Sequence, residues 1–119
     1  MRGLAAACAA SLLWVSACGP IRSKGAAVSA AEQAIGASHV TRSDAKAMTW
    51  QQWQERSGNR GGPVPGPSAS TKVWAVALHG QFRKLPGVSA VVIIDATTGN
   101  MIMGTTGTGW DWPPYWDSL

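Results

Sequence analysis

The sequence predicts an α+β fold in which a short helix packs on a three- to four-stranded antiparallel sheet. Three observations lead to this prediction. Apolar side chains alternate with their neighbours along residues 72–80, as they do in a strand with two different faces. Residues 90–94 are apolar throughout, as in a central strand, and residues 30–38 carry apolar side chains at helical spacing.

The composition of the 119-residue chain fits one small domain with a hydrophobic core. Hydrophobic residues make up 45% and charged residues 13%, which is too apolar for a fully disordered protein. The formal net charge is +4, and nine of the ten basic residues are spread thinly between Arg22 and Lys84. Because there is no run of Lys and Arg, we expect no nucleic-acid binding.

Residues 1–17 are typical of a secretory signal peptide. Arg2 is followed by an apolar stretch of 14 residues, shorter than the roughly 20 that a transmembrane helix needs. The stretch ends in Val15-Ser16-Ala17-Cys18, which resembles the lipobox of bacterial lipoproteins. The resemblance implies cleavage between Ala17 and Cys18 and attachment of diacylglycerol to the Cys18 thiol.

Lipid on Cys18 predicts a protein anchored in the cell membrane and facing its extracytoplasmic side, since two or more acyl chains hold a protein stably on a bilayer. Two alternatives remain: an ordinary signal peptide with a chance Cys, and cleavage before Cys8, which would leave almost no apolar segment. Cys8 leaves with the signal peptide. Cys18 is then the only thiol of the mature chain, and no intramolecular disulfide is expected.

After the signal peptide we expect a tether over residues 18–27 and one α+β domain over residues 28–106. The domain begins with a short helix over about residues 30–38. Ser29 and Glu32 have the spacing of a capping box at the start of this helix. The side chains expected to be buried by the helix are those of Ala31, Ala34 and Ile35.

The next segment has two possible interpretations. Residues 40–48 alternate partly with period two, which indicates a strand, and Thr49 and Gln52 then have the spacing of a second capping box. A single helix over residues 44–56 is the alternative, and we favour the strand followed by a short helix. The residues that share one face of this short helix are Trp50 and Trp53.

A Gly- and Pro-rich segment over residues 57–71 interrupts the domain. It holds four Gly and three Pro, and we expect a mobile surface loop. Farther along, residues 95–100 form a turn that leads into a return strand over residues 101–103, with Gly99 at positive φ. Asp95 has the position of a carboxylate that accepts backbone N–H bonds in the turn, and we favour this role over a general base or cation ligand.

Two segments resemble the pattern of PepSY domains: Val73-Trp-Ala-Val-Ala-Leu-His-Gly80 and Val91-Val-Ile-Ile-Asp95-Ala-Thr-Thr-Gly99-Asn100-Met-Ile102. That pattern is a strand of the form W-x-V-x-L-x-G, a strand that ends in D-A-x-T-G, and a short return strand. The resemblance covers about residues 28–105. It implies a cystatin-like layout with a helix across an antiparallel sheet, and a class of exported domains associated with restraining peptidases. It brings no catalytic residue.

The residues that carry chemistry do not form a recognisable catalytic or metal pattern. The two histidines, His39 and His79, are the only imidazoles, and a zinc site would need further ligands from scattered positions. No G-x-S-x-G sequence and no phosphate-binding glycine loop occur, and Glu32 and Glu55 do not have the spacing of a glycosidase pair. We therefore expect no enzymatic activity, no metal and no cofactor.

The last residues, 107–119, are expected to form a flexible Trp-rich tail. Its aromatic residues are a candidate interaction surface: Trp110, Trp112, Tyr115 and Trp116. They could lie at a lipid headgroup layer, stack on a glycan or anchor a protein partner. The alternative, which we favour, is that they fold back on the domain, because four exposed aromatic side chains would lower solubility.

The sequence thus predicts an exported, lipid-anchored binding or regulatory protein of the bacterial cell envelope. The partners expected for it are the membrane, through the lipid on Cys18, and an envelope protein or peptidase. The alternative is a membrane- or cell-wall-surface protein that acts through its aromatic C-terminal tail.

Overall fold

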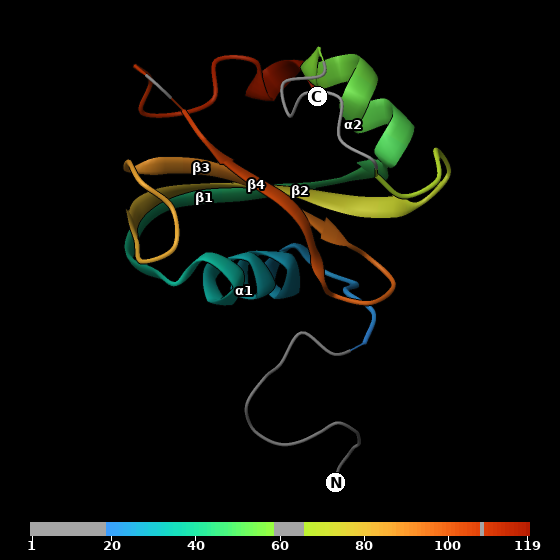
Figure 1. Ribbon diagram of the computed structural model, residues 1–119, viewed down its shortest axis with the longest axis horizontal. Coiled ribbons are helices and arrows are strands. Elements are labelled where there is room, and N and C mark those ends of the chain that lie inside the picture. Colours follow the sequence, from blue (N-terminus) through green and yellow to red (C-terminus); the bar gives the residue numbers. More distant parts are fainter. Residues whose placement is uncertain (1–18, 59–65, 108) are drawn as a thin grey trace, which may run out of the picture.

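The computed structural model describes residues 19–58, 66–107 and 109–119, so the signal peptide over residues 1–17 and the lipidation site Cys18 lie outside the described residues. The described chain forms a four-stranded antiparallel sheet with helices packed on it (Figure 1). The elements in chain order are α1 (Lys24–Ile35), β1 (Ala37–Thr49), α2 (Trp50–Ser57), β2 (Lys72–Phe82), β3 (Ser89–Asp95), β4 (Met101–Thr106) and the 3₁₀ turn η1 (Trp116–Ser118). This arrangement confirms the predicted α+β fold.

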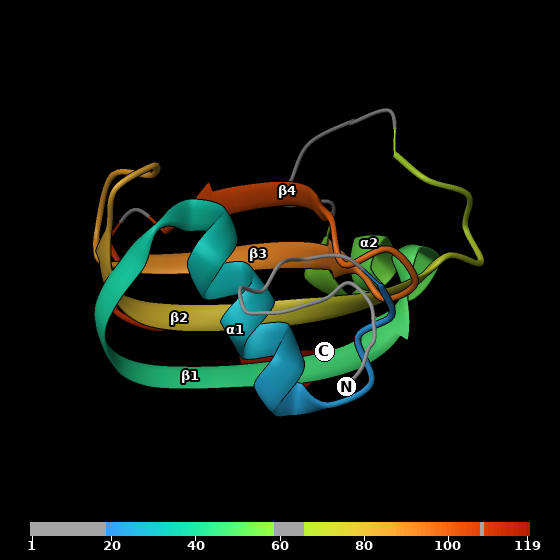
Figure 2. The same ribbon diagram turned by 90° about the horizontal axis from the view of Figure 1, so that it is seen from below.

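The strands follow one another across the sheet in the order β1-β2-β3-β4, and every neighbouring pair is antiparallel. Helix α1 lies across one face, as the view from below shows (Figure 2). Helix α2 and the C-terminal segment lie on the other face (Figure 1). The molecule therefore has three layers: α1 covers one face of the sheet, and α2 and the C-terminal segment together cover the other.

The register of β2 decides which side chains face α1. Val76 is opposite Ala45 of β1 and Val92 of β3, and these side chains pack with α1 in one core cluster. The alternate residues Ala75 and Ala77 belong to the cluster on the opposite face. The alternation along residues 72–80 therefore gives the correct register.

Helix α1 begins earlier than predicted, and its cap is a different serine. Ser23 is the N-cap, and its hydroxyl accepts a hydrogen bond from the amide of Ala26 at 3.1 Å. Ser29 lies inside the helix, so the predicted capping box with Glu32 is wrong. Gly36 ends the helix with φ of 66°, a left-handed conformation that glycine adopts without strain.

The expected tether is also part of the domain from Gly19 onward. The amide of Gly19 donates to the carbonyl of Thr98 at 3.3 Å, and the amide of Ile21 donates to that of Ala96 at 2.7 Å. The indole Nε1 of Trp74 donates to the carbonyl of Ile21 at 2.9 Å. The predicted tether over 18–27 is therefore wrong for its described residues, because backbone hydrogen bonds hold Gly19 and Ile21 against the β3–β4 turn and residues 24–27 begin α1.

The segment after α1 is a strand followed by a short helix, as favoured. The Thr49 hydroxyl accepts from the Gln52 amide at 3.1 Å, and the Gln52 side chain accepts from the Thr49 amide at 3.0 Å. Both hydrogen bonds of the capping box are present, and they satisfy amides that the first turn of the helix leaves free. Trp50 and Trp53 are both buried on the sheet side.

The loop expected over residues 57–71 packs at its two ends. Ser57 is buried at the end of α2, and the amides of Trp50 and Gln51 donate to the carbonyls of Thr71 and Ala69. The prediction of a mobile loop is therefore wrong for these positions, because Ser57 belongs to α2 and the carbonyls of Ala69 and Thr71 complete the first turn of that helix. Residues 59–65, which hold the remainder of the predicted loop, lie outside the described residues.

The β3–β4 turn has the predicted chemistry. The Asp95 carboxylate accepts hydrogen bonds from the amides of Thr97 at 2.8 Å and Thr98 at 3.1 Å. Gly99 is buried and has φ of 79°. The structure thus gives Asp95 the turn role that the sequence favoured.

Candidate functional site

The C-terminal segment packs on the sheet face opposite α1. Tyr115 and Trp116 are buried there, and the ring of Tyr115 lies 6.2 Å from that of Trp53 in α2. Residues 109–119, for which the sequence predicts a flexible tail, are therefore a layer of the domain. The reason is that β2 and β3 are apolar on both faces, so the face opposite α1 needs a cover that α2 alone does not supply.

Three charged residues of edge strand β1 position this segment. Arg42, Asp44 and Lys46 alternate along the strand, so their side chains point to the same face. The Arg42 guanidinium lies 3.9 Å from the ring centroid of Trp112, in cation–π geometry. The indole Nε1 of Trp116 donates to Asp44 at 2.9 Å, and Lys46 Nζ donates to the carbonyl of Trp116 at 2.6 Å. The aromatic segment is thus bound through both its rings and its backbone.

The pKa of Asp44 is lowered from its ordinary value by the contacts that surround its carboxylate. Partial burial raises the pKa of Asp44. Hydrogen bonds from the Trp116 indole and the Ala45 amide, together with the positive charge of Lys24 at 3.5 Å, outweigh this effect and lower the pKa below its usual value. The ionised carboxylate is therefore the form that holds Trp116.

The four aromatic residues of the candidate interaction surface separate into two pairs. Tyr115 and Trp116 are buried and do not offer a surface, so the favoured alternative, in which the aromatic residues fold back on the domain, is confirmed for these two. Trp110 and Trp112 remain half-buried, and Arg42 beneath Trp112 is exposed. We call the surface formed by Arg42, Trp110 and Trp112 the aromatic face. The aromatic face lies toward the end of the sheet where β3 begins. There the hydroxyl of Ser89, the first residue of β3, donates to the backbone carbonyl of Asp111, which lies between the two tryptophans in the sequence.

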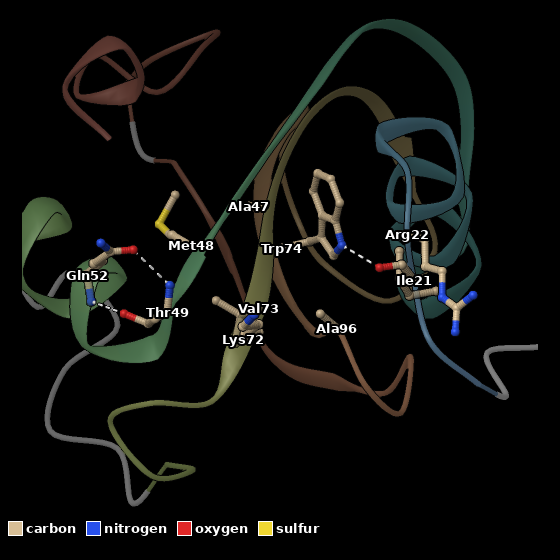
Figure 3. Close-up of a pocket in the computed structure, with 10 residues that line it drawn as sticks. All are labelled: Ile21, Arg22, Ala47, Met48, Thr49, Gln52, Lys72, Val73, Trp74 and Ala96. Carbon is tan, nitrogen blue, oxygen red and sulfur yellow. Dashed lines mark hydrogen bonds between the residues drawn. The ribbon is translucent and has the colours of Figure 1, made fainter.

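The opposite end of the sheet contains a cavity of about 510 Å³ (Figure 3). Its lining comes from the segment before α1, the end of β1, the start of α2, the start of β2 and the β3–β4 turn. Its lining includes two basic side chains, Arg22 and Lys72, and two large apolar side chains, Ile21 and Trp74. Trp74 is half-buried, and its indole is fixed by the carbonyl of Ile21. The sequence did not indicate this cavity, because its lining residues come together only in the fold.

The other candidate residues are dispersed. His79 forms a hydrogen bond of 3.0 Å with the Thr41 hydroxyl, and His39 lies at an irregularity of β1 with φ of 51°. Glu55 accepts a hydrogen bond from Gln51 at 3.2 Å, one turn earlier in α2. In the described part of the chain, no three His, Cys, Asp or Glu side chains are close enough together to hold a metal ion.

No family model matches the chain, and neither a curated protein nor a solved structure matches it. Among the residues that the structure describes, no helix combines the length and the apolar character needed to span a bilayer.

Proposed function

We propose that this chain is a lipid-anchored protein of the bacterial cell envelope whose domain binds another envelope protein and performs no catalysis. The signal peptide and the Cys18 lipobox support export and anchoring. The observation that carries the binding role is the aromatic face, where Arg42 is exposed and both Trp110 and Trp112 are half-exposed. Trp and Arg are the residue types most enriched where protein interfaces gain their affinity.

The resemblance to PepSY domains supports a peptidase as the class of partner. A four-stranded antiparallel sheet with a helix across one face has the layout that this resemblance implies. The additional layer formed by α2 and residues 109–119 is a departure from that plain layout, and it carries the aromatic face. Regulation of the partner through this added layer is the most specific form of the proposal.

Anchoring is tested by the mass and the location of the protein in cells. The chain purified from membranes should begin at Cys18 and carry the mass of attached lipid. The Cys18→Ala variant should lose that mass and its detergent partitioning, while its circular dichroism stays that of the wild type. An unchanged mass and unchanged partitioning of this variant would contradict the lipoprotein assignment.

Partner binding is tested by site-specific photo-crosslinking in intact cells. A photo-reactive residue at Arg42 should form a covalent product with one envelope protein, whereas the same residue at the exposed Glu55 should not. The captured protein is then purified, and its binding to wild type and to Trp112→Ala is compared. Binding that is equal for both proteins would contradict the aromatic face as the binding surface.

The second candidate function, action at the cell wall through aromatic stacking, uses the same half-exposed rings of Trp110 and Trp112. It predicts co-sedimentation of the purified domain with isolated peptidoglycan, lost in Trp112→Ala. Point substitutions are required for both tests. Deletion of residues 110–119 would also remove the buried Trp116 and uncover the core, so loss of binding after deletion would not identify a surface.

A further inference from the structure

The end of the sheet that contains the cavity is also the end at which the described chain begins. The backbone hydrogen bonds from Gly19 and Ile21 hold the first described residues along the β3–β4 turn, and Figure 2 shows this segment beside that turn. Cys18 is joined to Gly19 by one peptide bond, so consecutive Cα atoms are about 3.8 Å apart. A lipid on Cys18 therefore leaves the domain at this end, with no long tether between them.

The mouth of the cavity carries positive charge that is not neutralised. Arg22 and Lys72 are both exposed, and neither forms an ion pair with a residue that the structure describes. None of the residues that line the cavity is acidic. The carboxylate of Asp95, which neighbours the lining residue Ala96, is held in the turn by two amides that bind Oδ1, and it forms no ion pair with Arg22 or Lys72. The cavity thus combines two unpaired cations with the apolar surface of Ile21 and Trp74.

We propose that this cavity binds the phosphate headgroup of an anionic phospholipid in the membrane to which the chain is anchored. The proposal rests on the lipidation of Cys18 in the proposed function, which places this end of the domain at the bilayer. A guanidinium binds phosphate oxygens through paired N–H donors, and an ammonium adds a mobile point charge. The cavity volume of about 510 Å³ lies in the range of small-molecule sites.

The indole of Trp74 fits this environment. Tryptophan is enriched at the level of lipid headgroups, where its apolar ring and its N–H group meet different surroundings. Here the N–H is already bonded to the carbonyl of Ile21, so the ring is held in place among the residues that line the cavity (Figure 3). Headgroup binding would hold the sheet upright on the membrane. The aromatic face, at the other end of β1 and β2, would then point away from the bilayer toward other envelope proteins.

The test uses the mature chain without its lipid, so that only the domain can bind. The protein is secreted with the signal peptide of an ordinary exported protein and with Cys18→Ser. Flotation with vesicles measures its binding to phosphatidylcholine that contains a quarter of phosphatidylglycerol, and to phosphatidylcholine alone. Arg22→Gln and Lys72→Gln should each weaken binding to the anionic vesicles about fivefold, and together about 25-fold.

The matched control is the double variant Arg83→Gln and Lys84→Gln, which removes one arginine and one lysine charge at the opposite end of the sheet. It should change vesicle binding less than twofold. An equal loss in this control would overturn the proposal and assign binding to overall charge. Absence of wild-type binding to anionic vesicles would also overturn the proposal. Tight binding of free glycerol phosphate by a protein that does not bind vesicles would overturn it as well. Because these proteins carry no lipid, the outcome is independent of the mass measurement that tests lipidation of Cys18.

Discussion

The hydrogen bond between Trp116 and Asp44 is the polar contact that we expect to contribute most to holding the C-terminal layer. In Trp116→Phe the ring stays large and apolar, but the donor to Asp44 Oδ2 is lost. A hydrogen bond to a charged group contributes about 1.5–3 kcal/mol when both partners are buried. The Asp44 side chain is 36% exposed, so water compensates for part of the lost hydrogen bond. We therefore expect the free energy of unfolding to fall by about 1–2 kcal/mol, a value that includes the smaller apolar area of the Phe ring.

The assay is urea unfolding followed by far-ultraviolet circular dichroism, which does not depend on the fluorescence of the substituted residue. Trp112→Phe is the matched control, because no hydrogen bond of the Trp112 indole to a described residue is observed and its ring lies over exposed Arg42. This control should cost less than about 0.5–1 kcal/mol. Trp116→Ala should cost about 3–5 kcal/mol, which approaches the whole stability of a small domain.

The pH dependence gives a second readout of the same bond. The pKa of Asp44 is lowered in the folded chain, so the unfolded chain takes up this proton more readily than the folded chain. The stabilisation from this group is fully present above the usual pKa of Asp, about 3.9, and is lost as the pH falls through the lower pKa of the folded state. The difference between wild type and Trp116→Phe should therefore shrink below about pH 4. Equal costs for Trp116→Phe and Trp112→Phe, with no pH dependence of the difference, would refute the reasoning.

Two further substitutions and two segment replacements test the fold by the same unfolding assay. Gly99→Val should destabilise by about 1–2 kcal/mol or more, because a β-branched residue is strained at φ of 79°, and a cost near zero would mean that the turn relaxes. Trp74→Ala should cost about 2–3 kcal/mol, below the value for a fully buried Trp, because its side chain is only half-buried; a cost above about 4 kcal/mol would indicate deeper burial. Replacing residues 59–65 with a Gly/Ser segment of equal length should change stability by less than about 1 kcal/mol. The same replacement of 66–71 should cost more, because a more flexible backbone loses more entropy when the carbonyls of residues 69 and 71 bond to the first turn of α2.

Local patterns along the chain were sufficient for β2, β3 and the β3–β4 turn. Period-two alternation gives the register of β2 because a one-residue shift would turn its apolar side chains to the wrong face. The Asp95 turn is equally local, since its acceptor and donors lie within three residues of one another. Helix α1 was predicted six positions late because two serines, Ser23 and Ser29, precede alanine-rich segments. Only Ser23 is at a position where the preceding residues pair with the β3–β4 turn.

Contacts between segments far apart in the sequence could not be predicted from local sequence patterns. Arg42, Asp44 and Lys46 alternate in a way that indicates a polar strand face, and such a face normally meets water. In the structure this face binds the aromatic segment near the C-terminus. Lys46 and Asp44 bond there to Trp116, which is about 70 residues away from them in the sequence. Sequence spacing specifies which residues share a face, but it contains no information about which other segment covers that face.

The sequence holds seven Trp beside one Tyr and one Phe, and the packing of this cover explains part of that excess. On the sheet face opposite α1, β2 contributes the small side chains Ala75 and Ala77, which leave a shallow surface at its centre. Close packing then requires large side chains from the covering layer, and Trp53 and Trp116 supply them from α2 and from the C-terminal segment. The face toward α1 is packed differently, because α1 itself presents the small residues Ala27 and Ala31 and approaches the larger side chains of the sheet. Small residues in the sheet therefore pair with tryptophans in the cover, and small residues in the helix pair with aliphatic side chains in the sheet.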